Sequence, residues 1–218
     1  MEENLQEQNK MPLIGEKAPD FSAVTTQGNM NFPSDYEGKW VILFSHPADF
    51  TPVCTTEFIA FQDIKPDLDK RNVELLGLSI DSIHSHIAWE RTILEKFGRK
   101  IEFPIIADLD MKVAKAYGMI QPALSDTSAS RAVFVIDDKQ KVRAMIYYPL
   151  SAGRNMDEIL RLIDSLQTTD KHKVATPANW RPGDKVIVPA PETAQGAEER
   201  ANSDEYECTD WFFCKKNI

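Results

Sequence analysis

Long apolar runs, basic clusters and cysteines are all scarce in this sequence of 218 residues. No apolar run approaches the ~18 residues that a membrane-spanning helix needs. The first ten residues, MEENLQEQNK, contain neither the basic nor the apolar part of a signal peptide. We therefore expect a cytoplasmic protein with no membrane partner.

Positive charge is also limited. Lys and Arg number 25 and Asp and Glu 34, so the formal net charge is −9, and no basic block is longer than Lys215-Lys216. Proteins that bind nucleic acid usually carry a basic patch or stripe. The composition therefore disfavours nucleic acid and anionic surfaces as partners.

Only three cysteines are present, an odd number. This count argues against a disulfide framework, and the apolar fraction of 42% is enough for an ordinary core. Reactive thiols or a metal site are the alternatives that remain, and the cysteine count does not separate them.

Apolar runs rich in β-branched residues alternate with helical periodicity. We predict strands at 40–45, 74–80, 132–136 and 141–148, with a hairpin-like turn at Asp137-Asp138. Such alternation is typical of an α/β fold with a parallel or mixed sheet covered by helices.

Three apolar faces predict helices between these strands. The first follows Cys54, the second follows a possible Ser82 cap, and the third follows Asn155, with Glu158 in capping-box spacing. Their expected apolar faces are Phe58, Phe61, Ile64 and Leu68; then Ile83, Ile87, Leu94 and Phe97; then Met156, Ile159, Leu160, Ile163 and Leu166.

The amino-acid composition changes after the third predicted helix, because four of the 13 prolines fall between 177 and 191. Proline disfavours helix interiors and central strands. We predict a main domain at 12–170 and an extended arm at 171–218, within which the acidic stretch 192–207 is a solvated connection.

The segment around Cys54, SHPADFTPVCTTE, follows directly on a predicted strand. Thr51 and Pro52 have the form of an N-cap and a first helical residue, so Cys54 falls in the first helical turn. Free backbone N–H groups and the helix dipole would stabilise a thiolate there. The alternative is a buried, inert cysteine that packs as a small apolar residue.

The stretch from Pro47 to Cys54 matches the pattern P-x-x-x-T-x-x-C and resembles the peroxiredoxin family, in particular its one-cysteine, or peroxiredoxin six, subfamily. The similarity continues through DSIHSHIAW, FPIIAD, SRAVFVID, GRNMDEILRLIDSLQ and VATPANWRPGD, and so covers nearly the whole chain. The resemblance implies a thioredoxin-like fold with a C-terminal dimerisation arm. It also implies a thiol-dependent peroxidase that needs no cofactor and no metal.

By the same resemblance, Cys54 is the peroxidatic cysteine. Pro47 belongs to the substrate pocket, and Thr51 and Arg131 bind the peroxide, with Arg131 also stabilising the thiolate. Without the motif, Arg131 would read as a surface residue beside a strand.

Three further residues are expected at the pocket. Glu57, one helical turn after Cys54, could orient an arginine, although a glutamate there also simply complements the helix dipole. Arg154 is expected as a second arginine, or else as a charge before a capped helix. His46 is expected near the thiol, or else as a structural hydrogen-bond donor.

The tail YECTDWFFCKK holds Cys208 and Cys214. It resembles the archaeal and bacterial branch of the subfamily, in which a C-terminal cysteine resolves the sulfenic acid, usually across a dimer. We expect Cys214 to resolve, Cys208 to exchange with the first disulfide, and the aromatic residues 211–213 to dock the tail on an apolar surface. A zinc site is disfavoured by the spacing of the pair, and His84 and His86 would point to different helix faces.

The implied partners are a peroxide substrate, a thioredoxin-like reductant and a second copy of the chain, with a homodimer and a larger ring such as a decamer. Three alternative functions are compatible with a fold of this class. A disulfide oxidoreductase would need a cysteine where Thr51 stands, and a serine lipase would need a serine where Lys39 stands. A holdase chaperone or oligomeric scaffold remains the alternative to an enzyme.

Overall fold

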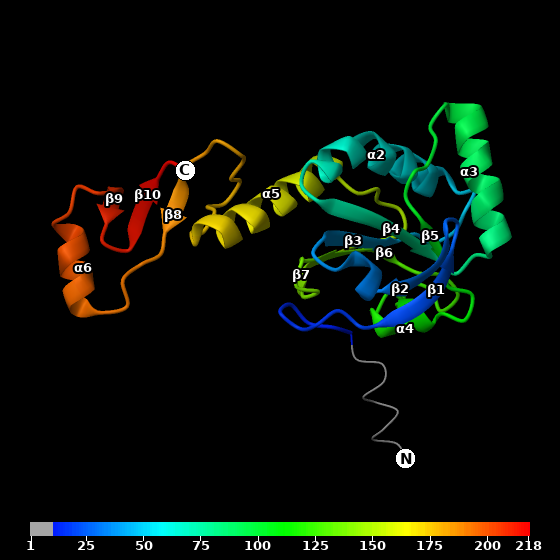
Figure 1. Ribbon diagram of the computed structural model, residues 1–218, viewed down its shortest axis with the longest axis horizontal. Helices are drawn as coiled ribbons and strands as arrows, with labels where there is room; N and C mark the ends of the chain where they lie inside the picture. The colour runs from blue at the N-terminus through cyan, green and yellow to red at the C-terminus, as the bar shows by residue number, and fades with distance from the viewer. Residues whose placement is uncertain (1–10) are drawn as a thin grey trace, which may run out of the picture. The chain divides into compact units, whose positions relative to one another are not determined.

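A computed structural model describes residues 11–218, which form two units, one ending at Met156 and the other comprising Asp157–Ile218 (Figure 1). The first unit contains a seven-stranded mixed sheet in the order β2-β1-β5-β4-β3-β6-β7. Its strands are β1 (Phe21–Thr25), β2 (Gly28–Phe32), β3 (Trp40–Ser45), β4 (Val73–Ser79), β5 (Ile105–Ala107), β6 (Arg131–Ile136) and β7 (Val142–Tyr148). Its helices are η1 (Ser34–Tyr36), α2 (Pro52–Asp69), α3 (Ile83–Phe97) and α4 (Lys112–Ala116).

The central strands explain the apolar runs of the sequence. All six residues of β3 are buried, because β3 pairs with β4 in parallel and with β6 in antiparallel fashion and has side chains covered on both faces. Phe44 stacks on Phe61 of α2. Leu43 points to the opposite core cluster, which includes residues of α4. The predicted α/β sheet and the antiparallel β6–β7 hairpin are confirmed.

Helix α2 begins as the sequence predicts. Thr51 is the N-cap in an extended conformation and Pro52 is the first helical residue. The Thr51 hydroxyl makes no capping hydrogen bond, however, and it donates instead to the carbonyl of Ala48 at 2.9 Å. The carbonyl of Thr51 accepts from the backbone N–H of Thr55.

Helix α3 shows one prediction confirmed and one wrong. The Ser82 hydroxyl caps the helix by accepting from the N–H of Ser85. The predicted apolar face is wrong: Ile87, Leu94 and Phe97 are exposed, and the helix buries instead His86, Trp89 and Ile93. Two residues of the buried face, His86 and Trp89, have rings that contain polar nitrogens. A search for purely apolar side chains at helical spacing therefore does not find this face.

The second unit contains more regular structure than an extended arm. Helix α5 (Met156–His172) belongs to it from Asp157 on, and β8 (Val186–Val188), β9 (Glu207–Asp210) and β10 (Phe213–Lys216) form a small sheet in the order β8-β10-β9. Helix α6 (Ala194–Ala201) occupies part of the stretch predicted to be a solvated connection, and none of its residues is buried.

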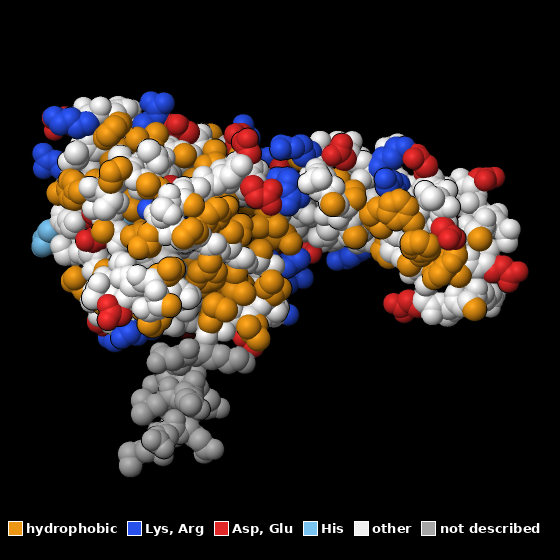
Figure 2. All heavy atoms as spheres, turned by 180° about the vertical axis from the view of Figure 1, so that it is seen from behind, with side chains coloured by type: hydrophobic (Ala, Val, Ile, Leu, Met, Phe, Trp, Pro, Cys, Tyr) orange, Lys and Arg blue, Asp and Glu red, His pale blue; other side chains and the backbone are white. Residues whose placement is uncertain are grey.

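Trp180 gives this unit a small core of its own. Its ring is buried with Val174 and Val186, and its Nε1 donates to the carbonyl of Asp184 at 3.1 Å. Trp180 is therefore covered within its own unit, at 2% exposure. Figure 2 shows apolar side chains at the surface of this unit. Within residues 11–218, no helix is both long and apolar enough to cross a membrane.

Candidate active site

Cys54 is the third residue of α2 and is a free, fully buried thiol. At this position its own N–H has no acceptor four residues earlier in the helix, and the positive end of the helix dipole lies at the sulfur. The burial alone would fit an inert cysteine. The sulfur differs from that of an ordinary apolar core position in having charged groups beside it.

Arg131, the first residue of β6, is directed at the sulfur. Its Nη1 carries two hydrogens, and it donates to Cys54 Sγ at 3.2 Å and to Glu57 Oε2 at 2.8 Å. Nε and Nη2 both donate to the carbonyl of Leu150, at 2.9 and 2.7 Å. Arg131 is only 3% exposed, so the reading of a surface arginine is wrong. Its guanidinium is held in place by a backbone carbonyl on one side and a carboxylate on the other.

Glu57 links this arginine to Arg154. Glu57 Oε1 accepts from the backbone N–H and the Nε of Arg154, both at 2.9 Å, and Oε2 accepts from Arg154 Nη2 at 2.6 Å. With the bond from Arg131, the carboxylate accepts four hydrogen bonds, which fills its capacity. The structure therefore places Glu57 as the group that orients both arginines.

Arg154 is nearly fully buried, and burial lowers the pKa of its guanidinium while Glu57 opposes that shift. Its Nη1 donates to the carbonyls of Ser45 and Ala132, at 2.9 and 3.0 Å. The guanidinium also lies over the ring of Phe44, 5.1 Å from the centroid. Arg154 thus ties the ends of β3 and β6 to the helix that carries Cys54.

Thr51 and Pro47 lie in the loop that precedes α2, and both are partly exposed. Since the single hydroxyl hydrogen of Thr51 is donated to Ala48, Oγ1 is left as an acceptor for a bound O–H group. An apolar groove of about 420 Å³ adjoins this residue. The groove is lined by Phe50, Thr51, Pro52, Thr55, Thr56, Ile59, Trp89, Thr92, Ile93 and Phe97.

His46 lies directly after β3 and is fully buried, and its Nε2 is 2.8 Å from Asp49 Oδ1. The other carboxylate oxygen of Asp49 is 2.8 Å from Nδ1 of His86. Burial lowers the pKa of His46. For Asp49, burial is outweighed by the hydrogen bonds from the two histidines, which hold its pKa well below the usual range. Sequence reasoning missed Asp49 and His86, although the H-x-x-D spacing after a strand could have indicated Asp49.

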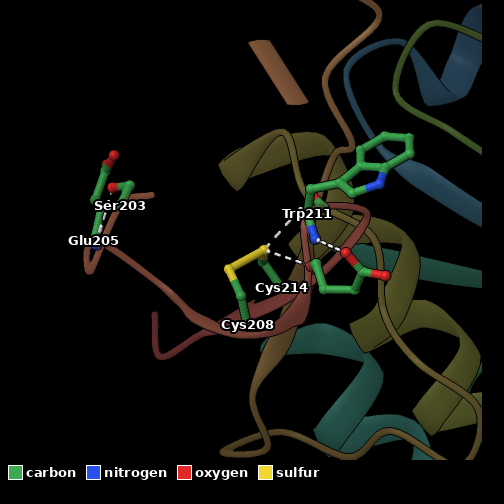
Figure 3. The surroundings of a disulfide bond; sticks show 6 residues. Ser203, Glu205, Cys208, Trp211 and Cys214 are labelled. Carbon is green, nitrogen blue, oxygen red and sulfur yellow. Dashed lines mark hydrogen bonds between the residues drawn. A yellow bond between two sulfur atoms is a disulfide. The ribbon is translucent and has the colours of Figure 1, made fainter. Parts of the chain in front are cut away.

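Cys208 and Cys214 lie in the second unit and form a disulfide (Figure 3). They face each other across the antiparallel pair β9–β10. Cys214 is fully buried, whereas Cys208 is partly exposed. Trp211, Phe212 and Phe213, at and after the turn between these strands, are exposed on their own unit. The predicted bridge between Cys54 and Cys214 is not present in this state and stays a prediction.

Residues 14–145 match the model of the AhpC/TSA family, and residues 165–203 match the C-terminal domain of 1-Cys peroxiredoxin. The fold is thioredoxin-like, and a buried cysteine at a helix N-terminus faces an arginine on its sheet. These matches place a protein with this fold and site in a class of thiol enzymes. The chain belongs to the peroxiredoxin family, and it is a thiol-dependent peroxidase.

The similarity to individual peroxiredoxins extends along nearly the whole chain. A peroxiredoxin of Aquifex aeolicus is 57% identical, over 95% of this chain and 98% of the relative, and one of Methanosarcina mazei is 56% identical, over 94% and 98%. A solved yeast mitochondrial 1-Cys peroxiredoxin is 41% identical with a TM-score of 0.83, covering 95% of this chain and all of the other. Peroxiredoxin 6 of Arenicola marina, as a C45S mutant, is 36% identical with a TM-score of 0.82, covering 94% of this chain and 98% of that one. These comparisons do not favour the holdase alternative.

Proposed function

We propose that Cys54 is the nucleophile of the peroxidase reaction. The observation that carries this assignment is the 3.2 Å contact from Arg131 Nη1 to Cys54 Sγ at the start of α2. A thiolate there attacks one oxygen of the hydroperoxide, so that an S–O bond forms and the O–O bond breaks. The other oxygen leaves as water or an alcohol after taking up a proton, and Cys54 becomes a sulfenic acid.

Thr51 and Arg131 bind the peroxide in this scheme. Thr51 Oγ1 accepts the O–H of the substrate, because its own hydrogen is committed to Ala48. Arg131 has one Nη2 hydrogen for which the described residues offer no recorded acceptor, and this N–H can stabilise the charge that develops on the leaving oxygen. Pro47, Glu57, Arg154 and His46 complete the pocket, with Glu57 holding both arginines in place.

Hydrogen peroxide and small organic hydroperoxides are the proposed substrates. The apolar groove beside Thr51 supports the second class, because it offers an apolar surface to an alkyl substituent. No part of the proposed step requires a dissociable cofactor or a metal.

The tail cysteines resolve the sulfenic acid. The Cys214 thiol condenses with the Cys54 sulfenic acid, giving a disulfide and water, and Cys208 then attacks the Cys214 sulfur and releases the Cys54 thiolate. The Cys208–Cys214 disulfide supports this order, since it is the product of the second exchange. Cys208 is the more accessible sulfur of that bond, so a dithiol reductant is expected to attack there.

A thioredoxin-like protein is the proposed reductant. The similar yeast mitochondrial enzyme is described in terms of thiol resolution by glutathione/thioredoxin systems. We place the reaction in the cytoplasm and the chain in a homodimer, with a larger ring such as a decamer as the next level. The exposed aromatic residues 211–213 support association with a second copy, and light scattering that gives a monomer at micromolar concentration would contradict it.

The proposed nucleophile is tested by peroxide consumption with dithiothreitol as reductant. Cys54→Ser is expected to abolish turnover and to leave the fold intact, because serine keeps the size of the side chain and removes only the reactive sulfur. Cys208→Ser is the matched control, since dithiothreitol can reduce the sulfenic acid directly. Substantial turnover by folded Cys54→Ser would falsify the assignment.

A further inference from the structure

Three buried polar side chains, His46, Asp49 and His86, form a cluster beside the Glu57 network. The side chains of all three are at most 1% exposed. His46 follows β3, Asp49 lies in the loop before α2, and His86 lies on α3. Because buried polar groups are costly unless they are paired, the hydrogen positions of the cluster can be worked out from its contacts.

Asp49 is an ionised acceptor toward both rings. Its two carboxylate oxygens lie 2.8 Å from His46 Nε2 and from His86 Nδ1, so each of these nitrogens carries a hydrogen. Asp81 Oδ2 accepts from the backbone N–H of Asp49 at 3.0 Å and holds the loop in this position.

His86 donates from both nitrogens. Its Nε2 lies 3.2 Å from the carbonyl oxygen of Ile106, which can only accept. With Nδ1 bound to Asp49, both ring nitrogens face acceptors, and the ring is therefore an imidazolium paired with the Asp49 carboxylate.

His46 is different, because its Nδ1 is buried and has no hydrogen-bond partner among the described residues. Its Nε2 carries the hydrogen, so a neutral ring leaves Nδ1 as an unprotonated acceptor. The ring packs on Phe58, with 4.7 Å between centroids, and Phe58 lies one helical turn after Cys54 on α2. The carbonyl of the preceding residue, Ser45, accepts from Arg154. His46 thus lies between the two networks.

We propose that Asp49 and His86 are positioning residues of the peroxidase, which hold His46 as the neutral Nε2–H tautomer beside the Cys54 turn. In the opposite tautomer the Nε2 lone pair would face the Asp49 carboxylate, which is repulsive. A ring held neutral adds no charge of its own, so Arg131 and the start of α2 set the electrostatic field at the sulfur. The inference rests on the proposed role of Cys54.

The same three residues could also ligate a metal ion, because their ligand atoms lie within 4.8 Å of one another. The hydrogen-bonded arrangement is favoured by the contacts. Each carboxylate oxygen already has a ring N–H at 2.8 Å, and the side chains are closed off from solvent. Metal binding is therefore an outcome that would overturn the proposal.

The tautomer is tested first, by nitrogen NMR of the histidine rings in the full-length, reduced protein. We expect His46 to show one protonated nitrogen, Nε2, and one bare nitrogen, Nδ1, and His86 to show two protonated nitrogens. His84→Asn, on the exposed side of α3, assigns the signals and leaves those of His46 unchanged. A protonated Nδ1 on His46 would overturn the proposal whatever the activity of Cys54.

The functional part is tested by a double-mutant cycle on the single-turnover oxidation of Cys54. Asp49→Asn is expected to slow this step about 10-fold, the lower end of the effect of losing a partner that orients a functional group. In a His46→Asn background, Asp49→Asn should have no further effect, because its influence passes through the ring. Additive effects, or an unchanged rate in Asp49→Asn, would overturn the proposal.

Two further measurements keep the test decisive. If Asp49→Asn does not fold, His86→Asn removes the charged partner and should alter the His46 nitrogen signals and slow the same step. Titration of the wild-type protein with Co²⁺ is expected to give no visible ligand-field bands; bands that disappear in His86→Asn would identify a metal site instead. Failure of the Cys54 assignment is recognised separately, by turnover in Cys54→Ser.

Discussion

Arg131 Nη1 donates to Cys54 Sγ at 3.2 Å although the two residues are 77 positions apart in the chain. The same nitrogen also binds Glu57, so the position of this guanidinium depends on a carboxylate one helical turn after the cysteine. The surroundings of the sulfur are therefore fixed by a buried ion network.

Arg131→Met is expected to slow the oxidation of Cys54 by something like 10² or more, because it removes a preorganised donor at the reacting atoms. Stopped-flow single-turnover oxidation by hydrogen peroxide measures this step. Arg99→Met is the control, since Arg99 pairs with Asp63 at an exposed site. A wild-type rate in Arg131→Met would make the arginine a bystander.

Glu57→Gln is expected to lower the free energy of unfolding by about 3–5 kcal/mol, since it leaves two buried guanidinium groups without their carboxylate. The oxidation rate should fall with it, because Arg131 loses its orientation. Urea unfolding gives the first quantity. Glu74→Gln removes the partner of Lys39 at a partly exposed pair and should change stability by no more than about 1 kcal/mol. Similar losses in the two variants would argue against the network.

Acid should destabilise the fold through His46. Burial lowers its pKa in the folded state, so below about 6.5 the unfolded chain binds a proton that the folded chain does not, and stability falls as pH falls. Asp49, with a lowered pKa, stabilises the fold above about 3.9 and loses that contribution as the pH falls further. The groups facing His46 are Asp49, His86 and Asp81.

The measurement is the urea midpoint at several values between about pH 7 and about pH 5, the window of the histidine. His46→Asn should lose the slope that this residue causes, and His84→Asn should keep it. An unchanged slope in His46→Asn would show that the acid sensitivity arises elsewhere.

Peroxide treatment should produce a dimer band on a non-reducing gel in Cys208→Ser, because the bridge between Cys54 and Cys214 then cannot pass on to the Cys208–Cys214 pair. Cys214→Ser should give no such band and should lose turnover with thioredoxin. If Cys214→Ser keeps both and Cys208→Ser loses both, the roles of the two cysteines are exchanged.

Several secondary-structure elements follow from short stretches of the sequence. Strand β3 and the start of α2 at Thr51-Pro52 were predicted at their observed positions, because a run of apolar residues and a Thr-Pro pair at a helix start are signals that span only a few residues. The short strands β1, β2 and β5 were missed. They are stabilised by pairing with neighbouring strands, and a segment of three to five residues carries too short a pattern to predict a strand by itself.

The candidate site divides in the same way. The resemblance of the sequence to the peroxiredoxin family identified five residues of the site, Cys54, Thr51, Arg131, Glu57 and Arg154. The contacts between them form because β6 and the segment before α5 lie next to α2 in the fold. No local sequence pattern predicts that these segments meet. Asp49 and His86 are 37 residues apart, and their charge pair exists only because the loop before α2 meets α3 at one end of the sheet. Residue types and local caps follow from the sequence, whereas burial and the partner of each charge follow from the tertiary fold, because both depend on chain segments far apart.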